Sequence, residues 1–211
     1  MRLRNMVQTK NNYLIQLNQA KAHFLTYDQE QLIRKFQLQH DAQYFYVKFL
    51  CKLYRLSRST GDLERLENGH WQDANTFGEV MVLLDLLCDS RVDRCLAKQW
   101  QSMQSFGLNF HRELLESRDP FADRIDRAPE AFRKACLAFS ATPLSGCDIG
   151  YSIELFDGLS VAIQFWHGDD DFFPRVCWLW DANALQYLKY ETMHFAIGFI
   201  REQLLKQMRD K

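Results

Sequence analysis

The clearest alternation of apolar and polar residues lies in the C-terminal third of the chain. Residues 151–156 and 159–166 both alternate in this way, and the pair Asp157-Gly158 separates them. Alternation with period two is typical of β-strands, and an Asp-Gly pair favours the positive φ angles of a type I′ hairpin turn. A third apolar run occupies residues 175–180. The pattern therefore predicts a three-stranded antiparallel meander.

Apolar residues at helical spacing mark four other segments. Residues 11–26 predict an amphipathic helix. Thr76 and Glu79 fit a capping box, in which each side chain bonds the other residue's backbone N–H, and an apolar stripe follows them. Pro129 suits the first turn of a third helix. The last helix is predicted from the apolar residues between positions 193 and 208.

The remaining segments are less regular. Residues 44–53 alternate with apolar side chains on both faces, which predicts one strand, and a turn at residues 60–62 leads into a second strand. Residues 91–127 are charged and irregular and predict at most short helices. Asp181 is predicted to cap a short helix that runs through Leu188. We find no internal repeat and no linker, so the sequence predicts one α+β domain over residues 1–211, with a mainly antiparallel sheet and helices packed on it.

Composition and charge restrict the function. The chain is 47% hydrophobic and 14% aromatic, which is enough for a large core. Its 26 Lys and Arg and 27 Asp and Glu residues give a net charge of -1, which argues against nucleic acid as the main partner. Residues 1–12 have no apolar leader pattern, and no run of roughly 18 apolar residues exists, so we expect a cytoplasmic protein that does not enter a membrane. The six cysteines include no CxxC pair, which predicts reduced and mostly buried thiols.

The segment from Trp166 to Pro174, with residues 179–188 after it, resembles the signature of the domain-of-unknown-function family 3786, and Gly146, Asp148 and Gly150 resemble the approach to it. The specific resemblance spans residues 146–190. An extra Phe stands before Pro174, Trp stands at 180 where Phe is usual, and Asn stands at 183 where Ser is common. The family occurs mainly in anaerobic bacteria and archaea and has no established activity. Some relatives are associated with iron–sulfur and corrinoid methyl-transfer proteins, which implies an accessory role in anaerobic cofactor or methyl-transfer metabolism.

The acidic run Asp169-Asp170-Asp171 is the sharpest candidate for chemistry. With His167 and Asp148 it offers carboxylates and an imidazole to a metal ion, and a cation would relieve their mutual repulsion. However, consecutive side chains diverge, and the alternating pattern of a calcium loop is absent. The other interpretation is a solvated turn in which Asp side chains bond the backbone, and we favour it.

Aromatic and sulfur side chains give two further candidates. Trp166, Trp178 and Trp180 fall on the predicted meander, where they could line a pocket for a flat ligand, although core packing is the commoner role of such residues. Cys147 lacks a histidine nearby in sequence, so an inert thiol is favoured over a nucleophile. A nucleophilic Cys147 would need His167 or His194 to approach it through space as the base.

Two functions follow from these candidates. The first is a non-catalytic accessory module that binds a small molecule or a partner protein through the meander edge, using the loop at residues 168–174 and the tryptophans. The second is a metal-dependent enzyme that uses Asp169, Asp170 or Asp171 near Asp148 and His167. No motif names a catalytic residue, a metal site or a cofactor, and the sequence leaves a homodimer open.

Overall fold

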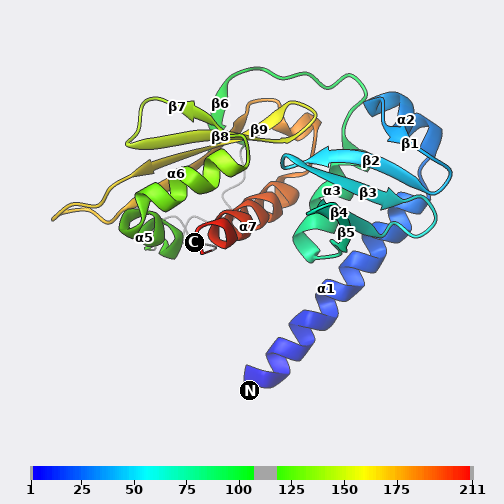
Figure 1. Cartoon of the computed structure of the whole chain (residues 1–211), viewed down its shortest axis with the longest axis horizontal. Coiled ribbons are helices and arrows are strands. Elements are labelled where there is room, and N and C mark those ends of the chain that lie inside the picture. Colours follow the sequence, from blue (N-terminus) through cyan, green and yellow to red (C-terminus); the bar gives the residue numbers. More distant parts are fainter. Residues whose placement is uncertain (1, 107–117, 210–211) are drawn as a thin grey trace. The chain divides into compact units, whose positions relative to one another are not determined.

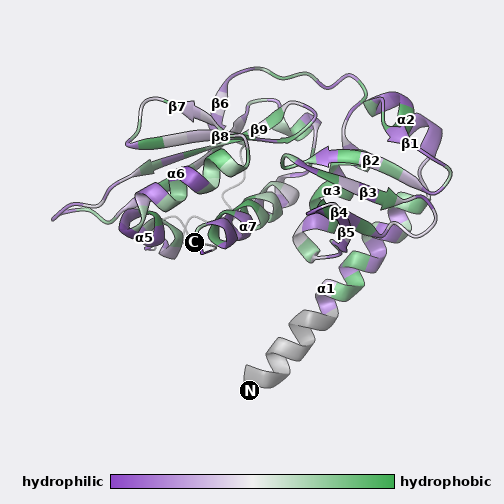
Figure 2. Cartoon of the chain, viewed as in Figure 1, coloured by the Kyte–Doolittle hydropathy of each residue, from purple (hydrophilic) through white to green (hydrophobic). Residues whose placement is uncertain are grey.

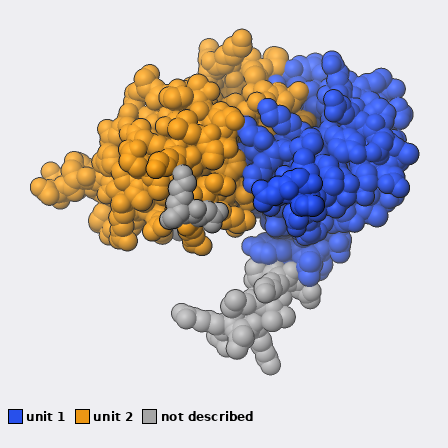
Figure 3. Space-filling view, viewed as in Figure 1, with its two compact units in different colours: residues 1–94, 186–196 blue, residues 95–185, 197–211 orange. Residues whose placement is uncertain are grey.

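Two five-stranded antiparallel sheets organise the chain in the computed structural model, which describes residues 2–106 and 118–209 (Figure 1). The α+β class and the C-terminal meander are therefore confirmed. The chain divides into two compact units, one formed by residues 1–94 and 186–196 and the other by residues 95–185 and 197–211 (Figure 3). Helix α7 (Tyr190–Gln207) contributes to both units, and the single domain over residues 1–211 stays a prediction.

Unit 1 contains a sheet in which each strand pairs with the next one in sequence, so the order is β1-β2-β3-β4-β5. Unit 1 includes the start of α7 and three further helices: α1 (Arg2–Leu25), α2 (Gln29–Phe36) and α3 (Phe77–Asp89). Its strands are β1 (Gln39–His40), β2 (Tyr44–Phe49), β3 (Lys52–Ser57), β4 (Leu63–Glu67) and β5 (His70–Asp73). Helices α1 and α3 correspond to the first predicted helix and to the predicted capped helix. They pack against each other.

Unit 2 contains the second sheet, in the order β6-β10-β9-β8-β7. Its strands are β6 (Trp100–Ser102), β7 (Thr142–Leu144), β8 (Ile149–Phe156), β9 (Leu159–Trp166) and β10 (Arg175–Asp181). Its helical segments are the 3₁₀ turns η1 (Met103–Phe106) and η2 (Ala184–Gln186), and the helices α5 (Pro120–Arg127) and α6 (Pro129–Ala138). Helix α5 packs on β10, and α6 packs on β8.

The core of unit 1 forms around α3, along which hydrophobic residues recur (Figure 2). Thr76 caps the helix as predicted, because its hydroxyl accepts from the Glu79 N–H at 3.4 Å. The Glu79 carboxylate, only 1% exposed, is used differently from the predicted capping box. It accepts from the Thr76 hydroxyl at 2.7 Å, from the Tyr54 hydroxyl at 2.9 Å and from Arg65. A buried carboxylate needs such partners, and these bonds tie α3 to β3 and β4.

The single strand predicted over residues 44–53 is wrong. The structure turns at Leu50 and Cys51, where φ is +47° and +58°, and β2 pairs with β3 as a hairpin. Turns of this kind usually contain Asn or Gly, because other side chains in the left-handed region cost about 1–2 kcal/mol. The sequence therefore carries no turn signal there, and the alternation continues through the turn because Leu50 is itself buried.

The C-terminal elements follow the prediction closely, with two differences. Asp157 and Gly158 form the β8–β9 turn with φ of +51° and +80°, as expected. The helix expected after Asp181 is only the 3₁₀ turn η2. Strand β6 was not predicted, because its three residues are defined by pairing with β10 and not by an apolar pattern. Part of the irregular segment, residues 107–117, lies outside the described residues. No helix in the described part of the chain is both long and apolar enough to cross a membrane.

Candidate functional site: the β9–β10 loop

The loop between β9 and β10 closes on itself through its first aspartate. The Asp169 carboxylate accepts from the backbone N–H of Asp171 at 2.9 Å and of Phe172 at 2.7 Å. The Asp169 N–H in turn donates to the Phe172 carbonyl at 2.9 Å. These bonds are the Asx turn that the sequence favoured, in which an aspartate side chain replaces a backbone acceptor. One carboxylate of the acidic run is therefore occupied by the loop itself.

Gly168 allows the two ends of the loop to touch. A Cβ atom at this position would lie 2.8 Å from Pro174 Cδ and 3.0 Å from Pro174 N. Side chains essentially do not pack at such distances, so any larger residue would force the ends apart. The glycine and the proline of the family-like segment therefore act together as a closure, and neither needs a ligand to explain it.

His167 fastens the base of the loop to two other segments. Its backbone N–H donates to Asp148 Oδ2 at 2.8 Å, and its Nδ1 bonds Asp126 Oδ1 of α5 at 2.8 Å. The carboxylate partner assigns the proton to Nδ1. The ring also meets Phe165 edge to face, with 5.0 Å between centroids. Asp148 and His167 thus lie together as parts of the scaffold beneath the loop, through the backbone N–H of His167.

The outer part of the loop is apolar and acidic. Phe172 and Phe173 are 73% and 67% exposed, and Asp170 and Asp171 beside them are also exposed. The Arg118 guanidinium lies 4.8 Å from the centre of the Phe173 ring. The loop extends beyond the ends of β9 and β10 and forms a narrow projection of unit 2 (Figures 1 and 3). A braced backbone thus presents two phenylalanines to solvent.

The three tryptophans do not gather at this loop. Trp178 and Trp180 lie on the buried side of β10, at 9% and 0% exposure, and Trp178 stacks on Phe121 of α5 at 6.0 Å. Trp166 is half-buried, and the Arg175 guanidinium lies 4.6 Å from the centre of its ring. The register places Trp166 opposite Arg175 and Trp178 opposite Ile163, so the three rings do not share one cross-strand position.

The part of the chain that the structure describes contains no complete set of metal ligands. Within residues 2–106 and 118–209, no three His, Cys, Asp or Glu side chains are arranged to hold a metal ion. None of the six cysteines forms a disulfide bond; Cys88 and Cys136 are buried, Cys147 is half-buried and Cys95 is exposed. Burial raises the pKa of the Cys88 thiol to about 12, so this thiol is protonated and unreactive.

Asp181, which also belongs to the family-like segment, has a scaffold role. Its carboxylate accepts from the N–H of Ala97 at 2.9 Å, of Lys98 at 2.7 Å and of Asn183 at 2.8 Å. The Asn183 amide donates to the Cys95 carbonyl at 3.0 Å. These bonds hold the segment before β6 against the end of β10, which explains why an acceptor and an amide stand at these two positions.

A group of titratable side chains in unit 1 was not predicted. Asp85 and Asp89 lie four residues apart on α3 and bind the same lysine. Lys189 Nζ donates to both, at 3.1 Å and 2.6 Å, and the Tyr27 hydroxyl donates to Asp89 at 3.1 Å. The Lys189 N–H also donates to Asp85 at 3.2 Å, directly before α7 begins. The sequence signal was the spacing of four, which places both residues on one side of a helix.

The environment separates the pKa values of these two carboxyl groups. Burial, and then the bond with Asp89, raises the pKa of Asp85. Burial also acts against the Asp89 carboxylate, but bonds from Asp85, Lys189 and Tyr27 outweigh it and lower its pKa to about 2. Burial and Asp89 raise the pKa of Tyr27 to about 12. One proton thus sits on Asp85 to a higher pH than on an ordinary aspartate, while Asp89 stays ionised.

The comparisons with known proteins agree with the family-like segment. Neither the curated proteins nor the solved structures contain a match to this chain. The profile of one family, described as "Domain of unknown function (DUF3786)", matches residues 28–202, which is most of the chain and includes the β9–β10 loop and the pair on α3. The chain therefore belongs to the DUF3786 family of domains of unknown function.

Proposed function

We propose that this chain is a binding protein that docks a partner protein through the β9–β10 loop, with Phe172 and Phe173 as the anchors. The observation that carries the proposal is a loop braced at several points that exposes two adjacent aromatic side chains. Aromatic residues, Phe among them, are enriched in protein interfaces, and a few such anchors usually dominate the binding energy. A loop that is already ordered loses little conformational entropy on binding.

The charge around the anchors specifies the partner surface. Asp170 and Asp171 stand directly before the phenylalanines and are exposed, so the partner site should be an apolar pocket with Lys or Arg at its edge. The proposed setting is the cytoplasm, and the proposed role is accessory, in anaerobic cofactor or methyl-transfer metabolism. The setting rests on the sequence pattern and the role on the family resemblance, whereas the docking surface rests on the loop geometry.

The test is to immobilise the chain, pass the lysate of the source cells over it, and compare the proteins that stay bound to the wild type and to variants. The wild-type chain is compared with the double variant Phe172→Ser/Phe173→Ser, and with Val92→Ser and Leu137→Ser, which remove exposed apolar side chains elsewhere. We expect one protein to be retained by the wild type and both controls and lost from the double variant. If the same proteins are retained by all four, the loop is not the docking surface.

The alternative is the metal-dependent enzyme that uses Asp169 to Asp171. One observation favours it, because His167 is oriented by Asp126 in the way that a carboxylate orients a metal-binding histidine. Elemental analysis of protein purified without oxygen and without chelators distinguishes the two functions. About one metal ion per chain, lost when Asp169 and Asp170 are changed to Ala, would replace the docking proposal.

A further inference from the structure

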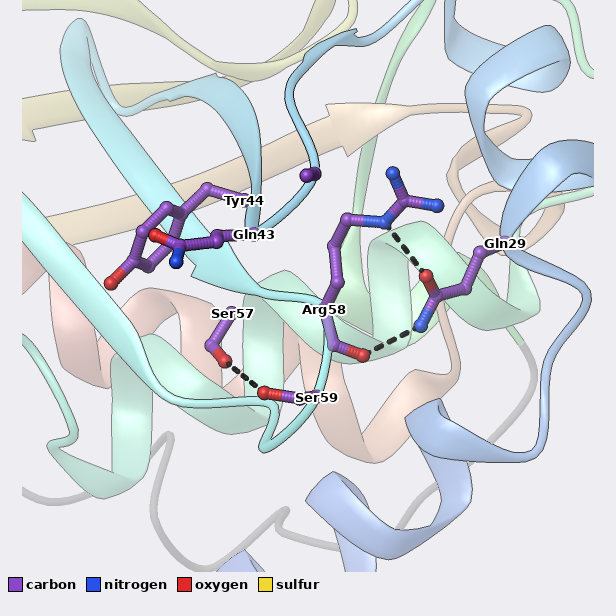
Figure 4. Close-up of a pocket in the computed structure, with 7 residues that line it drawn as sticks. Gln29, Gln43, Tyr44, Ser57, Arg58 and Ser59 are labelled. Carbon is purple, nitrogen blue, oxygen red and sulfur yellow. Dashed lines mark hydrogen bonds between the residues drawn. The ribbon is translucent and has the colours of Figure 1, made fainter.

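A cavity of about 530 Å³ opens on unit 1 where β2 begins and β3 ends (Figure 4). Its size falls within the range of small-molecule sites. Side chains with hydrogen-bonding groups dominate its lining: Gln29, Gln43, Tyr44, Ser57, Arg58 and Ser59. No family-like motif lies here, and the docking loop belongs to the other unit, so the cavity is independent of the proposed function.

Arg58 is held in one orientation at the edge of this cavity. Its Nε donates to Gln29 Oε1 at 2.9 Å, and the Gln29 amide returns a bond to the Arg58 carbonyl at 2.7 Å, as Figure 4 shows. Nη1 donates to the Asp41 carbonyl at 2.9 Å, and the guanidinium lies 5.1 Å from the centre of the buried Phe45 ring. A guanidinium fixed in this way loses little freedom when it binds a ligand.

Donors and acceptors remain around the fixed arginine. Both terminal nitrogens of a guanidinium carry a second N–H beyond the one used in the contacts above and in the Glu30 pair at 3.6 Å. The Ser57 and Ser59 hydroxyls lie 3.3 Å apart and can each donate or accept. Gln43 is exposed, and the structure gives its carboxamide no hydrogen-bond partner among the described residues. The lining thus offers donors and acceptors in similar numbers.

Charge and polarity restrict the ligand. The Glu30 carboxylate pairs with the one guanidinium of the lining at 3.6 Å, and two more carboxylates, those of Asp28 and Asp41, belong to residues directly before the lining residues Gln29 and Ala42. The Asp28 carboxylate already accepts from the N–H groups of Glu30 and Gln31 at the start of α2, so these two donors are not available to an anion. A phosphate or dicarboxylate would be repelled by this surplus of negative charge. An apolar ligand would remove water from polar groups without replacing its hydrogen bonds.

We infer that this cavity binds a neutral polyhydroxylated molecule, such as a sugar or a cyclitol. Neighbouring hydroxyl groups on a ring can accept from the two N–H groups at the end of Arg58 and exchange bonds with Gln43 and the serine pair. One face of the Tyr44 ring is covered by the Arg55 guanidinium at 4.4 Å, and a sugar ring would pack beside this stacked pair.

The test is calorimetric titration of the full chain with a panel of neutral hexoses, pentoses and myo-inositol, beside inorganic phosphate and acetate. At least one neutral compound should bind, and Arg58→Met and Gln43→Met should each weaken its binding about tenfold or more. Gln72→Met makes the same change as Gln43→Met at an exposed position on β5 and should bind like the wild type.

Three outcomes would overturn the inference. One is that no neutral compound binds at millimolar concentration, and another is that phosphate binds more tightly than any of them. The third is that Gln43→Met and Gln72→Met bind equally well. Gln43 is exposed and makes no side-chain bond that folding requires, so this variant keeps the test decisive even if Arg58→Met does not fold.

Discussion

Two groups of aspartates in this chain do opposite things with their charge. In the β9–β10 loop, the Asp169 carboxylate accepts hydrogen bonds from the backbone of its own loop, and Asp170 and Asp171 remain exposed. On α3, Asp85 and Asp89 converge on one lysine, which donates to both carboxylates. The first group is conspicuous in the sequence as three adjacent letters, whereas the second is two letters inside an apolar helix.

The difference teaches that spacing, not density, brings carboxylates together. Adjacent side chains in a turn point in different directions and have backbone N–H groups close at hand. Side chains four apart on a helix lie one above the other. The α3 pair is therefore the group whose removal should cost the most stability, and the loop group should cost less.

The largest effect is expected from Asp89→Ala. This change removes a carboxylate that accepts from Lys189 and Tyr27, so both donors lose a charged acceptor. A hydrogen bond to a charged group contributes about 1.5–3 kcal/mol. We therefore expect the free energy of unfolding, measured by urea denaturation, to fall by about 2–3 kcal/mol. Asp93→Ala, which breaks an exposed pair with Arg91, should change it by no more than about 0.5 kcal/mol. Equal losses in the two variants would contradict the account.

The next effect concerns pH. The pKa of Asp89 is about 2 in the folded chain, below its ordinary value of 3.8, so its ionised form stabilises the fold above pH 4. This stabilisation is lost as the pH falls from 4 towards 2. We therefore expect the stability advantage of the wild type over Asp89→Asn to narrow by about 1–2 kcal/mol between pH 5 and pH 2.

Asp85 supplies the matched control for this pH effect. Its pKa is raised, so its protonated form stabilises the fold at low pH, and this contribution is lost as the pH rises through its folded value. The difference between the wild type and Asp85→Asn should therefore change with pH in the opposite direction. Parallel pH curves for both variants would show that the two carboxyl groups are not a coupled pair.

A smaller effect distinguishes the neighbours within the loop. Asp169→Ala removes the acceptor of two backbone N–H groups and should lower the free energy of unfolding by about 1 kcal/mol, like the loss of a helix cap. Asp170→Ala changes an exposed side chain and should stay within about 0.5 kcal/mol of the wild type. Thermal unfolding of both variants measures the difference. An Asp170 effect as large as that of Asp169 would mean that the run acts as one unit.

Much of the fold could be predicted where local chemistry and pattern agree. The Asp157-Gly158 pair is typical of a hairpin turn, and Thr76 is typical of a helix N-cap. The β8–β9 turn and the start of α3 were therefore predicted correctly. The β2–β3 turn could not be predicted, because Leu50 and Cys51 take positive φ angles that their types do not favour. Strand β6 was missed because pairing with β10, a partner about 80 residues away in sequence, defines it.

The site was predictable only in part. The sequence identified the loop and its Asx turn. It did not show that Asp126 of α5 binds the His167 ring, since that contact spans 41 residues. The sequence favoured core packing for Trp178 and Trp180 without excluding a pocket, and both side chains are buried, Trp178 against Phe121 of α5. The Arg58 cavity joins α2 to two strand ends, so no local pattern indicated it.

The central claim is that the β9–β10 loop is ordered by its own bonds, ready to dock a partner. The most direct measurement is the ¹⁵N relaxation order parameter of the Asp171 and Phe172 amides in protein treated with a chelator. We expect values near 0.85, as in a rigid backbone, unchanged when a divalent metal ion is added. Values below about 0.6 that rise on addition of metal would contradict the account and favour a metal site in the acidic run.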